Sequence, residues 1–250
     1  MTFEYLTQCQ FPPLAEPYDS ALREAVAHIL LRFQPVGIIA SGTIIRGNPG
    51  PSSDLDVYVI HQDTFRQRIQ RLFNGVPAEI FVNSPQTVRG YFEDEHRNAR
   101  PITAHMLTTG FVVLNRDPVV ARLRQEAQDY LDTPPNPTVE QLRWFRYLIG
   151  SQYEDARDVA DKDPVTASII LRQAVYEMLR YRFRLANRFL PRDKDLLGGL
   201  DELDATLAEL ARSFYGTTNI KLQLDYAAQI AERTVRVTGF FEWESEAEKV

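Results

Sequence analysis

The sequence has very little cysteine and no long apolar run. Cys9 is the single cysteine among 250 residues, which excludes an internal disulfide framework and a thiolate metal cluster. No uninterrupted apolar stretch approaches the roughly 18 residues of a membrane span. The N-terminus also lacks a basic flank followed by an apolar core. These absences predict a cytoplasmic protein that does not contact a membrane.

Basic residues are outnumbered by acidic ones. The chain has 28 Lys and Arg against 34 Asp and Glu, for a net charge of −6. This balance argues against a general nucleic-acid binder, whose surface is usually basic. Hydrophobic residues make up 44% and charged residues 25%, as in an ordinary folded protein. Because domains usually contain about 100 to 150 residues, we expect two domains. We expect the protein to be a monomer or a homodimer.

The stretch 36–60, VGIIASGTIIRGNPGPSSDLDVYVI, contains two predicted strands joined by a polar loop. The apolar run at its start predicts a short buried strand that ends in a Ser-Gly-Thr turn at 41–43. A loop rich in Gly and Pro follows, and the β-branched segment 55–60 predicts a second strand. Asp54 and Asp56 lie at the start of that strand and should project from one face.

Three Asp-x-Asp motifs occur, beginning at Asp54, Asp161 and Asp193. The last two are predicted to be solvated turns or helix caps. Asp54 and Asp56 differ because two ionised carboxylates at the start of a buried strand repel each other and need a cation. Oxygen ligands suit Mg²⁺ or Mn²⁺, whereas the four scattered histidines do not suggest zinc. Carboxylates beside a hydroxyl-bearing turn are typical of a metal site that handles nucleoside triphosphates.

Glu79 is the natural third carboxylate, because it is the acidic residue in the otherwise apolar segment 78–82. From the residues alone, three interpretations stay open. The side chain is an exposed residue of an edge strand, a metal ligand, or a general base for an acceptor hydroxyl.

The pattern along the chain predicts an α+β protein: a small mixed β-sheet flanked by helices, then an all-α bundle. Three prolines in four positions stiffen the segment 132–137, so we place the domains at 1–132 and 138–250. The predicted strands are 36–40, 55–60, 77–82 and 111–114, and the predicted helices of the first domain are 18–33, 64–73, parts of 86–110, and 119–131. In the second domain an antiparallel hairpin around 161–164 and helices at 200–214 and 219–237 predict a four- or five-helix bundle.

These motifs resemble the nucleotidyltransferases of the DNA polymerase β superfamily. Gly42-Thr43 matches the Gly-Ser turn of that superfamily, Arg46-Gly47 matches a frequent Arg-Gly in the loop, and Ser53-Asp54-Leu55-Asp56 matches the Ser-Asp-x-Asp signature. The likeness covers roughly residues 18 to 85, and Thr43 departs from it by replacing the usual serine. A Glu as the third carboxylate and the two-domain plan look most like the aminoglycoside nucleotidyltransferases.

The resemblance implies a metal-dependent enzyme that moves a nucleoside monophosphate, expected to be AMP from ATP, to a hydroxyl of a small-molecule acceptor. Pyrophosphate would be released, and the acceptor would lie between the two domains. Asp54, Asp56 and Glu79 would be the catalytic and Mg²⁺- or Mn²⁺-binding residues. The residues implied to hold the nucleotide in the first domain are Ser41, Gly42, Thr43, Arg46 and Ser53.

The second domain has a basic stripe, because Arg172, Arg180, Arg184 and Arg188 are spaced by multiples of four. This stripe is either a solvated helix face paired with Asp and Glu of neighbouring helices or a source of cations that reach the triphosphate. Arg192 and Lys194 are the predicted nucleotide contacts. Two other functions stay open: nucleotidylation of a protein or RNA target in a toxin–antitoxin or regulatory system, and nucleotide binding without catalysis.

Overall fold

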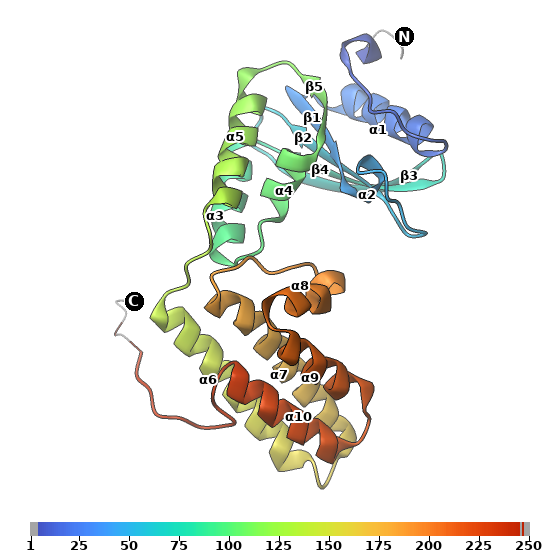
Figure 1. Ribbon diagram of the computed structural model, residues 1–250. Coiled ribbons are helices and arrows are strands. Elements are labelled where there is room, and N and C mark those ends of the chain that lie inside the picture. The colour runs from blue at the N-terminus through green and yellow to red at the C-terminus, as the bar shows by residue number, and fades with distance from the viewer. Residues whose placement is uncertain (1–4, 246, 248–250) are drawn as a thin grey trace. The chain divides into compact units, whose positions relative to one another are not determined.

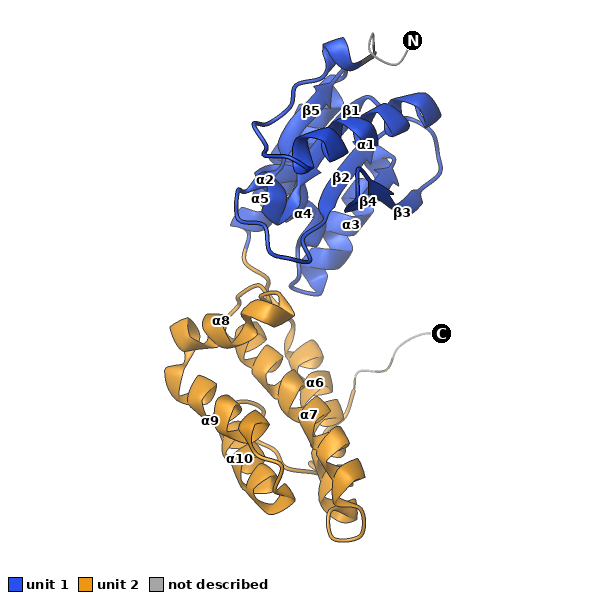
Figure 2. Ribbon diagram, turned by 90° about the vertical axis from the view of Figure 1, so that its right-hand side faces the viewer, with its two compact units in different colours: residues 1–133 blue, residues 134–250 orange. Residues whose placement is uncertain are grey.

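The computed structural model describes residues 5–245 and 247. The chain divides into two compact units, Met1–Thr133 and Pro134–Val250, shown in blue and orange in Figure 2. The first unit is a β-sheet with helices, and the second is helical. The predicted α+β class, with a small mixed sheet followed by a helical part, is confirmed.

The first unit contains a sheet of five strands with helices on both of its faces (Figure 1). In chain order its elements are η1, a 3₁₀ helix, at Tyr5–Gln8, α1 at Tyr18–Arg32, β1 at Gly37–Ser41, α2 at Gly42–Ile45, β2 at Leu55–Ile60, β3 at Gln67–Phe73, β4 at Val76–Asn83, α3 at Pro85–Arg97, α4 at Ile102–Thr109, β5 at Phe111–Asn115 and α5 at Pro118–Asp132. The strand order is β3-β4-β2-β1-β5. β2 and β4 run parallel and every other pair is antiparallel, so the sheet is mixed.

Alternation along the strands explains how both faces of the sheet are buried. Val57 and Val59 of β2 lie in the apolar cluster that contains the buried face of α1. Tyr58 and Ile60, one position on, lie in the cluster formed with α3, α4 and α5. Strands buried on both faces read as continuous apolar runs, which is why β1 and β2 are recognisable from sequence.

The helix predicted at 64–73 is wrong, because β3 is an edge strand that forms an antiparallel hairpin with β4. Asn74 and Gly75 join the two strands with φ values of 44° and 77°, as a two-residue type I′ turn requires. Most of β3 is exposed, with only Phe73 buried. An edge strand exposed on both faces has no alternation of apolar and polar residues, so the sequence lacks the usual strand signal.

The remaining predicted elements of the first unit are present, with ends shifted by a few residues. The segment 86–110 is resolved into α3 and α4, and the short strand at 111–114 is β5, at the opposite edge of the sheet from β3. The turn predicted at 41–43 is the end of β1 followed directly by the short helix α2.

The second unit is a bundle of five α-helices in the described part of the chain, within the predicted range of four or five. Its elements are α6 at Val139–Val159, α7 at Pro164–Leu185, the 3₁₀ turn η2 at Asp193–Asp195, α8 at Leu196–Leu203, α9 at Ala205–Gly216 and α10 at Ile220–Arg233. α6 and α7 form the predicted hairpin (Figure 1). None of the described helices combines the length and the apolar character that a membrane crossing requires.

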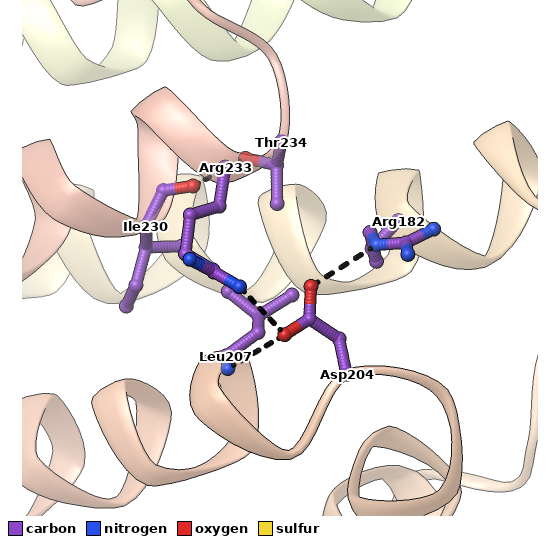
Figure 3. A network of polar contacts seen from close by, with 6 residues as sticks. All are labelled: Arg182, Asp204, Leu207, Ile230, Arg233 and Thr234. Atoms are coloured by element: carbon purple, nitrogen blue, oxygen red, sulfur yellow. Dashed lines mark hydrogen bonds and ion pairs between the residues drawn. The ribbon is translucent and has the colours of Figure 1, made fainter.

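The helix predicted at 200–214 is in fact two helices, because Asp204 ends α8 and caps α9. Its Oδ1 accepts a hydrogen bond from the Leu207 N–H at 3.1 Å, which is an N-cap interaction. The same carboxylate pairs with Arg182 of α7 at 3.4 Å and with Arg233 of α10 at 3.1 Å (Figure 3). One acidic side chain therefore joins three helices of the bundle.

The pKa of Asp204 is lower than that of an ordinary Asp. Burial acts to raise it, but the hydrogen bond from Leu207 and the two guanidinium groups of Arg233 and Arg182 outweigh that effect. The carboxylate is thus ionised and paired, and its charge contributes to holding α7, α9 and α10 together.

Candidate functional site

Three carboxylates meet at one end of the sheet. Asp54 directly precedes β2, Asp56 is the second residue of β2, and Glu79 is the residue of β4 opposite Asp56 in the parallel ladder. One oxygen from each of the three lies within 4.8 Å of the others, and all three residues are half-buried. The structure thus brings together the three acidic residues singled out from the sequence.

The register of the sheet explains this meeting. Side chains two positions apart share a face, so Asp56 and Glu79 continue the row formed by Tyr58 and Phe81, whose rings stack at 5.9 Å. Asn83 lies two residues further along and donates a hydrogen bond to the Tyr58 hydroxyl at 3.0 Å. The carboxylates therefore stand at the end of a packed row of side chains that fixes their strands.

The pKa of Asp56 is raised to about 6. Burial is the main cause, followed by the negative charges of Asp54 and Glu79, and Arg46 and Arg68 offset these only in part. A half-buried site made of oxygen ligands whose charges repel fits a hard divalent cation such as Mg²⁺ or Mn²⁺. No His or Cys belongs to the cluster among the described residues, which fits zinc poorly.

Gly42 is required at the turn beside the cluster. A Cβ atom at this position would lie 2.7 Å from Oδ2 of Asp56, closer than such atoms approach each other. The φ of Gly42 is also +92°, which side-chain-bearing residues rarely adopt. Ser41, opposite Asp56 in the β1–β2 ladder, is only 3% exposed, so it is a buried residue of the sheet.

The loop between α2 and β2 is tied back to the turn by hydroxyl groups. The Thr43 and Ser53 hydroxyl oxygens are 2.7 Å apart, and the Ser53 oxygen accepts a hydrogen bond from the Gly50 N–H at 2.8 Å. Ser53 precedes Asp54 directly, so this contact holds the start of β2 against the turn. Arg46 caps the C-terminal end of α2, and its charge acts on Asp56.

Two residues of β3 that the sequence did not single out support Glu79. Arg68 pairs with Oε2 of Glu79 at 2.8 Å, and Gln70 donates a hydrogen bond to Oε1. The Arg68 guanidinium also lies 4.4 Å from the centre of the Phe81 ring. Recognising 67–73 as a strand would have found both, because Arg68 and Gln70 are the cross-strand partners of Phe81 and Glu79.

A hollow of about 500 Å³ opens beside the carboxylates, within the range of small-molecule sites. Asp54 and Glu79 form part of its lining. The other lining residues come from the β3–β4 hairpin and are Gln70, Arg71, Leu72, Pro77 and Ala78. A substrate in this hollow would contact the carboxylate cluster directly.

The predicted arginine stripe of the second unit is only partly correct. Arg188 lies beyond the end of α7 at Leu185, so it does not share the helix face. Arg184 is 7% exposed and its guanidinium lies 4.2 Å from the centre of the Phe145 ring, so it is not on a solvated face. Arg180 pairs with Glu177 at 2.7 Å, but Glu177 lies on α7 itself and not on a neighbouring helix.

Arg192 and Lys194 belong to the second unit, at η2. The Arg192 side chain is held by Asp195 at 2.6 Å. Both residues are exposed. They and the carboxylate cluster belong to different units, so their contact with a nucleotide stays a prediction.

Comparison with known proteins shows the fold class of the chain. No protein-family model and no curated protein match it. A solved structure of similar fold is a nucleotidyltransferase-like protein from Exiguobacterium sibiricum 255-15. The two chains are 14% identical, with a TM-score of 0.52 over 85% of this chain and 74% of the other. The chain therefore has a nucleotidyltransferase-like fold, and the narrower resemblance to the aminoglycoside nucleotidyltransferases stays a prediction.

Proposed function

We propose that the protein transfers a nucleoside monophosphate from a nucleoside triphosphate to a hydroxyl group of a small molecule. The observation that carries this proposal is the meeting of Asp54, Asp56 and Glu79 beside the Gly42 turn, in a nucleotidyltransferase-like fold. ATP is the proposed nucleotide, and an aminoglycoside-like compound is the proposed acceptor.

In this reaction the acceptor hydroxyl oxygen forms a bond to the α-phosphorus, and the bond from that phosphorus to the bridging oxygen of the β-phosphate breaks. Pyrophosphate leaves, and the hydroxyl proton passes to a base. Mg²⁺ or Mn²⁺ held by Asp54 and Asp56 would neutralise charge on the phosphates. Glu79 is proposed to complete the ligand set or to accept the proton, and the contacts of Arg68 and Gln70 fix its carboxylate for either role.

The turn and the loop have separate roles in the proposal. Gly42 leaves the Asp56 carboxylate uncovered and lets the backbone approach a phosphate closely. The contact between Thr43 and Ser53 keeps the start of β2, and with it Asp54, in place. Arg46 is proposed to pair with the triphosphate, because its charge already acts on the neighbouring carboxylate.

The test is incubation of the purified protein with ATP labelled at the α-phosphate, Mg²⁺ and a panel of hydroxyl compounds that includes an aminoglycoside. We expect acceptor-dependent release of pyrophosphate and transfer of label to the acceptor. Asp54→Asn should lower the rate by at least about 100-fold, as loss of a charge-stabilising group does in other enzymes. Asp63→Asn is the matched control, because Asp63 lies beyond the other end of β2 and its side chain is 73% exposed.

Full activity of Asp54→Asn would refute the site. Label found on the protein itself or on added RNA, with none on any small molecule, would replace the small-molecule acceptor with a macromolecular target.

A further inference from the structure

The second unit carries a cluster of exposed aromatic rings that has no part in the proposed transfer. Trp144 and Tyr147 lie one turn apart on α6 and are 49% and 41% exposed. Trp243, in the segment after α10, approaches both, with ring centres at 5.9 Å and 5.4 Å. The Trp144 and Tyr147 rings are themselves 5.4 Å apart. Three large rings thus converge where water reaches them.

The segment that brings Trp243 to α6 is held there by hydrogen bonds from two arginines of α6. The Arg146 side chain donates a hydrogen bond to the Val235 carbonyl at 2.8 Å, and Arg143 donates one to the Glu244 carbonyl at 3.2 Å. A Cβ on Gly150 of α6 would lie 2.9 Å from the Gly239 carbonyl oxygen, so the close approach depends on that glycine. The rings are therefore held together by a built contact.

A hollow of about 680 Å³ lies between α6 and this segment. It is lined by Tyr147, Ser151, Glu154, Gly239, Phe240, Phe241, Glu242, Trp243 and Glu244. Three carboxylates and four aromatic side chains are in this set, and no Lys or Arg is present in it among the residues that the structure describes. The hollow has the size of a small-molecule site and a single sign of charge.

Three arginines contact residues that line the hollow, and one of them, Arg143, donates a hydrogen bond to the Glu244 carbonyl. The Arg146 guanidinium lies 4.9 Å from the centre of the Phe241 ring, and Arg157 pairs with Glu154 at 3.4 Å. Glu242 and Glu244 are exposed and make no ion pair with another described residue. Their negative charge is therefore left to attract a ligand.

We propose that this hollow binds a small organic ammonium cation. Ring faces carry negative potential that attracts ammonium groups, most strongly at tryptophan, and quaternary ammonium ligands are recognised in this way. The carboxylates add Coulomb attraction and disfavour anions. An apolar neutral compound would gain only the ring contacts. The proposal does not rest on the transfer activity, because every residue that carries it belongs to the second unit.

The chain offers a direct readout of this site. It contains two tryptophans, Trp144 and Trp243, and both belong to the ring cluster. Tryptophan fluorescence of the full chain is therefore titrated with choline and, in parallel, with its neutral isostere 3,3-dimethylbutan-1-ol. We expect a saturable change with choline and binding at least about fivefold weaker for the isostere, the size of a cation–π contribution. The absence of saturation with choline, or equal binding of the two compounds, would overturn the proposal.

Paired variants locate the binding. Tyr147→Ser should weaken choline binding at least about threefold, whereas Leu148→Ser, at a neighbouring position that is also 41% exposed but does not line the hollow, should not. Glu242→Gln should weaken it as well, while Asp155→Asn, an exposed carboxylate of α6 outside the hollow, should leave it unchanged. The Glu242 variant removes only an exposed charge, so its fold is not at risk. Equal effects within both pairs would contradict the assignment.

Discussion

Replacing Asp56 with asparagine tests whether the carboxylate cluster is unfavourable for the fold without a cation. The pKa of Asp56 is about 6, against 3.8 for an ordinary Asp. The folded protein therefore binds this proton more tightly than the unfolded chain does. The stability that this difference provides is fully present below pH 3.8 and is lost as the pH rises through 6.

The size of the effect follows from the pKa difference. About two pKa units correspond to about 3 kcal/mol, at 1.36 kcal/mol for each unit. Asp56 is half-buried, and solvent screens part of the repulsion, so we expect about 1 to 2 kcal/mol. Asparagine has nearly the same shape as aspartate and no charge. The Asp56→Asn variant should therefore be more stable than the wild type by this amount at pH 8, and much closer to it at pH 4.

The measurement is urea unfolding followed by circular dichroism, with a chelator present, at both pH values. Asp63→Asn controls for the loss of one exposed carboxylate and should change the free energy of unfolding by less than about 0.5 kcal/mol. Adding Mg²⁺ should stabilise the wild type more than Asp56→Asn, because Asp56 is one of the proposed metal ligands. If Asp56→Asn is no more stable than the wild type at pH 8 without metal, the electrostatic reasoning is wrong.

Three further variants test other parts of the structure. Gly42→Ala should abolish transfer and should lower the free energy of unfolding by at least about 1 kcal/mol more than Gly47→Ala does. Gly47 is the control because it also has a positive φ, but no atom lies within 4 Å of an added Cβ. Equal losses in urea unfolding would refute the predicted clash. Glu79→Gln should lower acceptor-dependent pyrophosphate release at least about 100-fold. If the variant needs the same Mg²⁺ concentration as the wild type, Glu79 is the base; if it needs a higher Mg²⁺ concentration, Glu79 is a metal ligand. Asp204→Ala should lower the stability of the second unit by about 2 to 3 kcal/mol at pH 7 and by less in acid, since the stabilisation from a lowered pKa is lost as the pH falls. Tryptophan fluorescence follows this unfolding, and Asp201→Ala, which breaks the exposed pair with Arg212, should cost much less than Asp204→Ala does.

The central strands and the acidic cluster could be predicted from the sequence because burial leaves a mark on composition. β2 begins and ends as predicted, since a strand covered on both faces must be apolar throughout. Asp54 and Asp56 stood out against the other two Asp-x-Asp motifs because they opened such a strand. Glu79 stood out for the same reason, as an acidic residue in an apolar run.

The parts that could not be predicted depend on contacts between distant segments or on exposure. β3 is an edge strand with little buried surface, so its composition did not separate it from a helix, although the Asn74-Gly75 hairpin signal pointed to the correct answer. The break at Asp204 was missed because the apolar spacing of 200–214 continues through it. Only its partners Arg182 and Arg233, on two other helices, show why the chain turns there.

The strand β3 contributes directly to the carboxylate site. As a helix, residues 64–73 would contribute nothing to Glu79, whereas as β3 they place Arg68 and Gln70 on its two carboxylate oxygens. Glu79 is thereby fixed from the edge of the sheet, whereas at its centre Gly42 leaves room for the Asp56 carboxylate. The residues that contact or adjoin the carboxylates here belong to strands and turns of the first unit. Its geometry depends on the register of β3, β4 and β2, so a change that shifts the β3–β4 hairpin should disturb the site as much as a change in the carboxylates themselves.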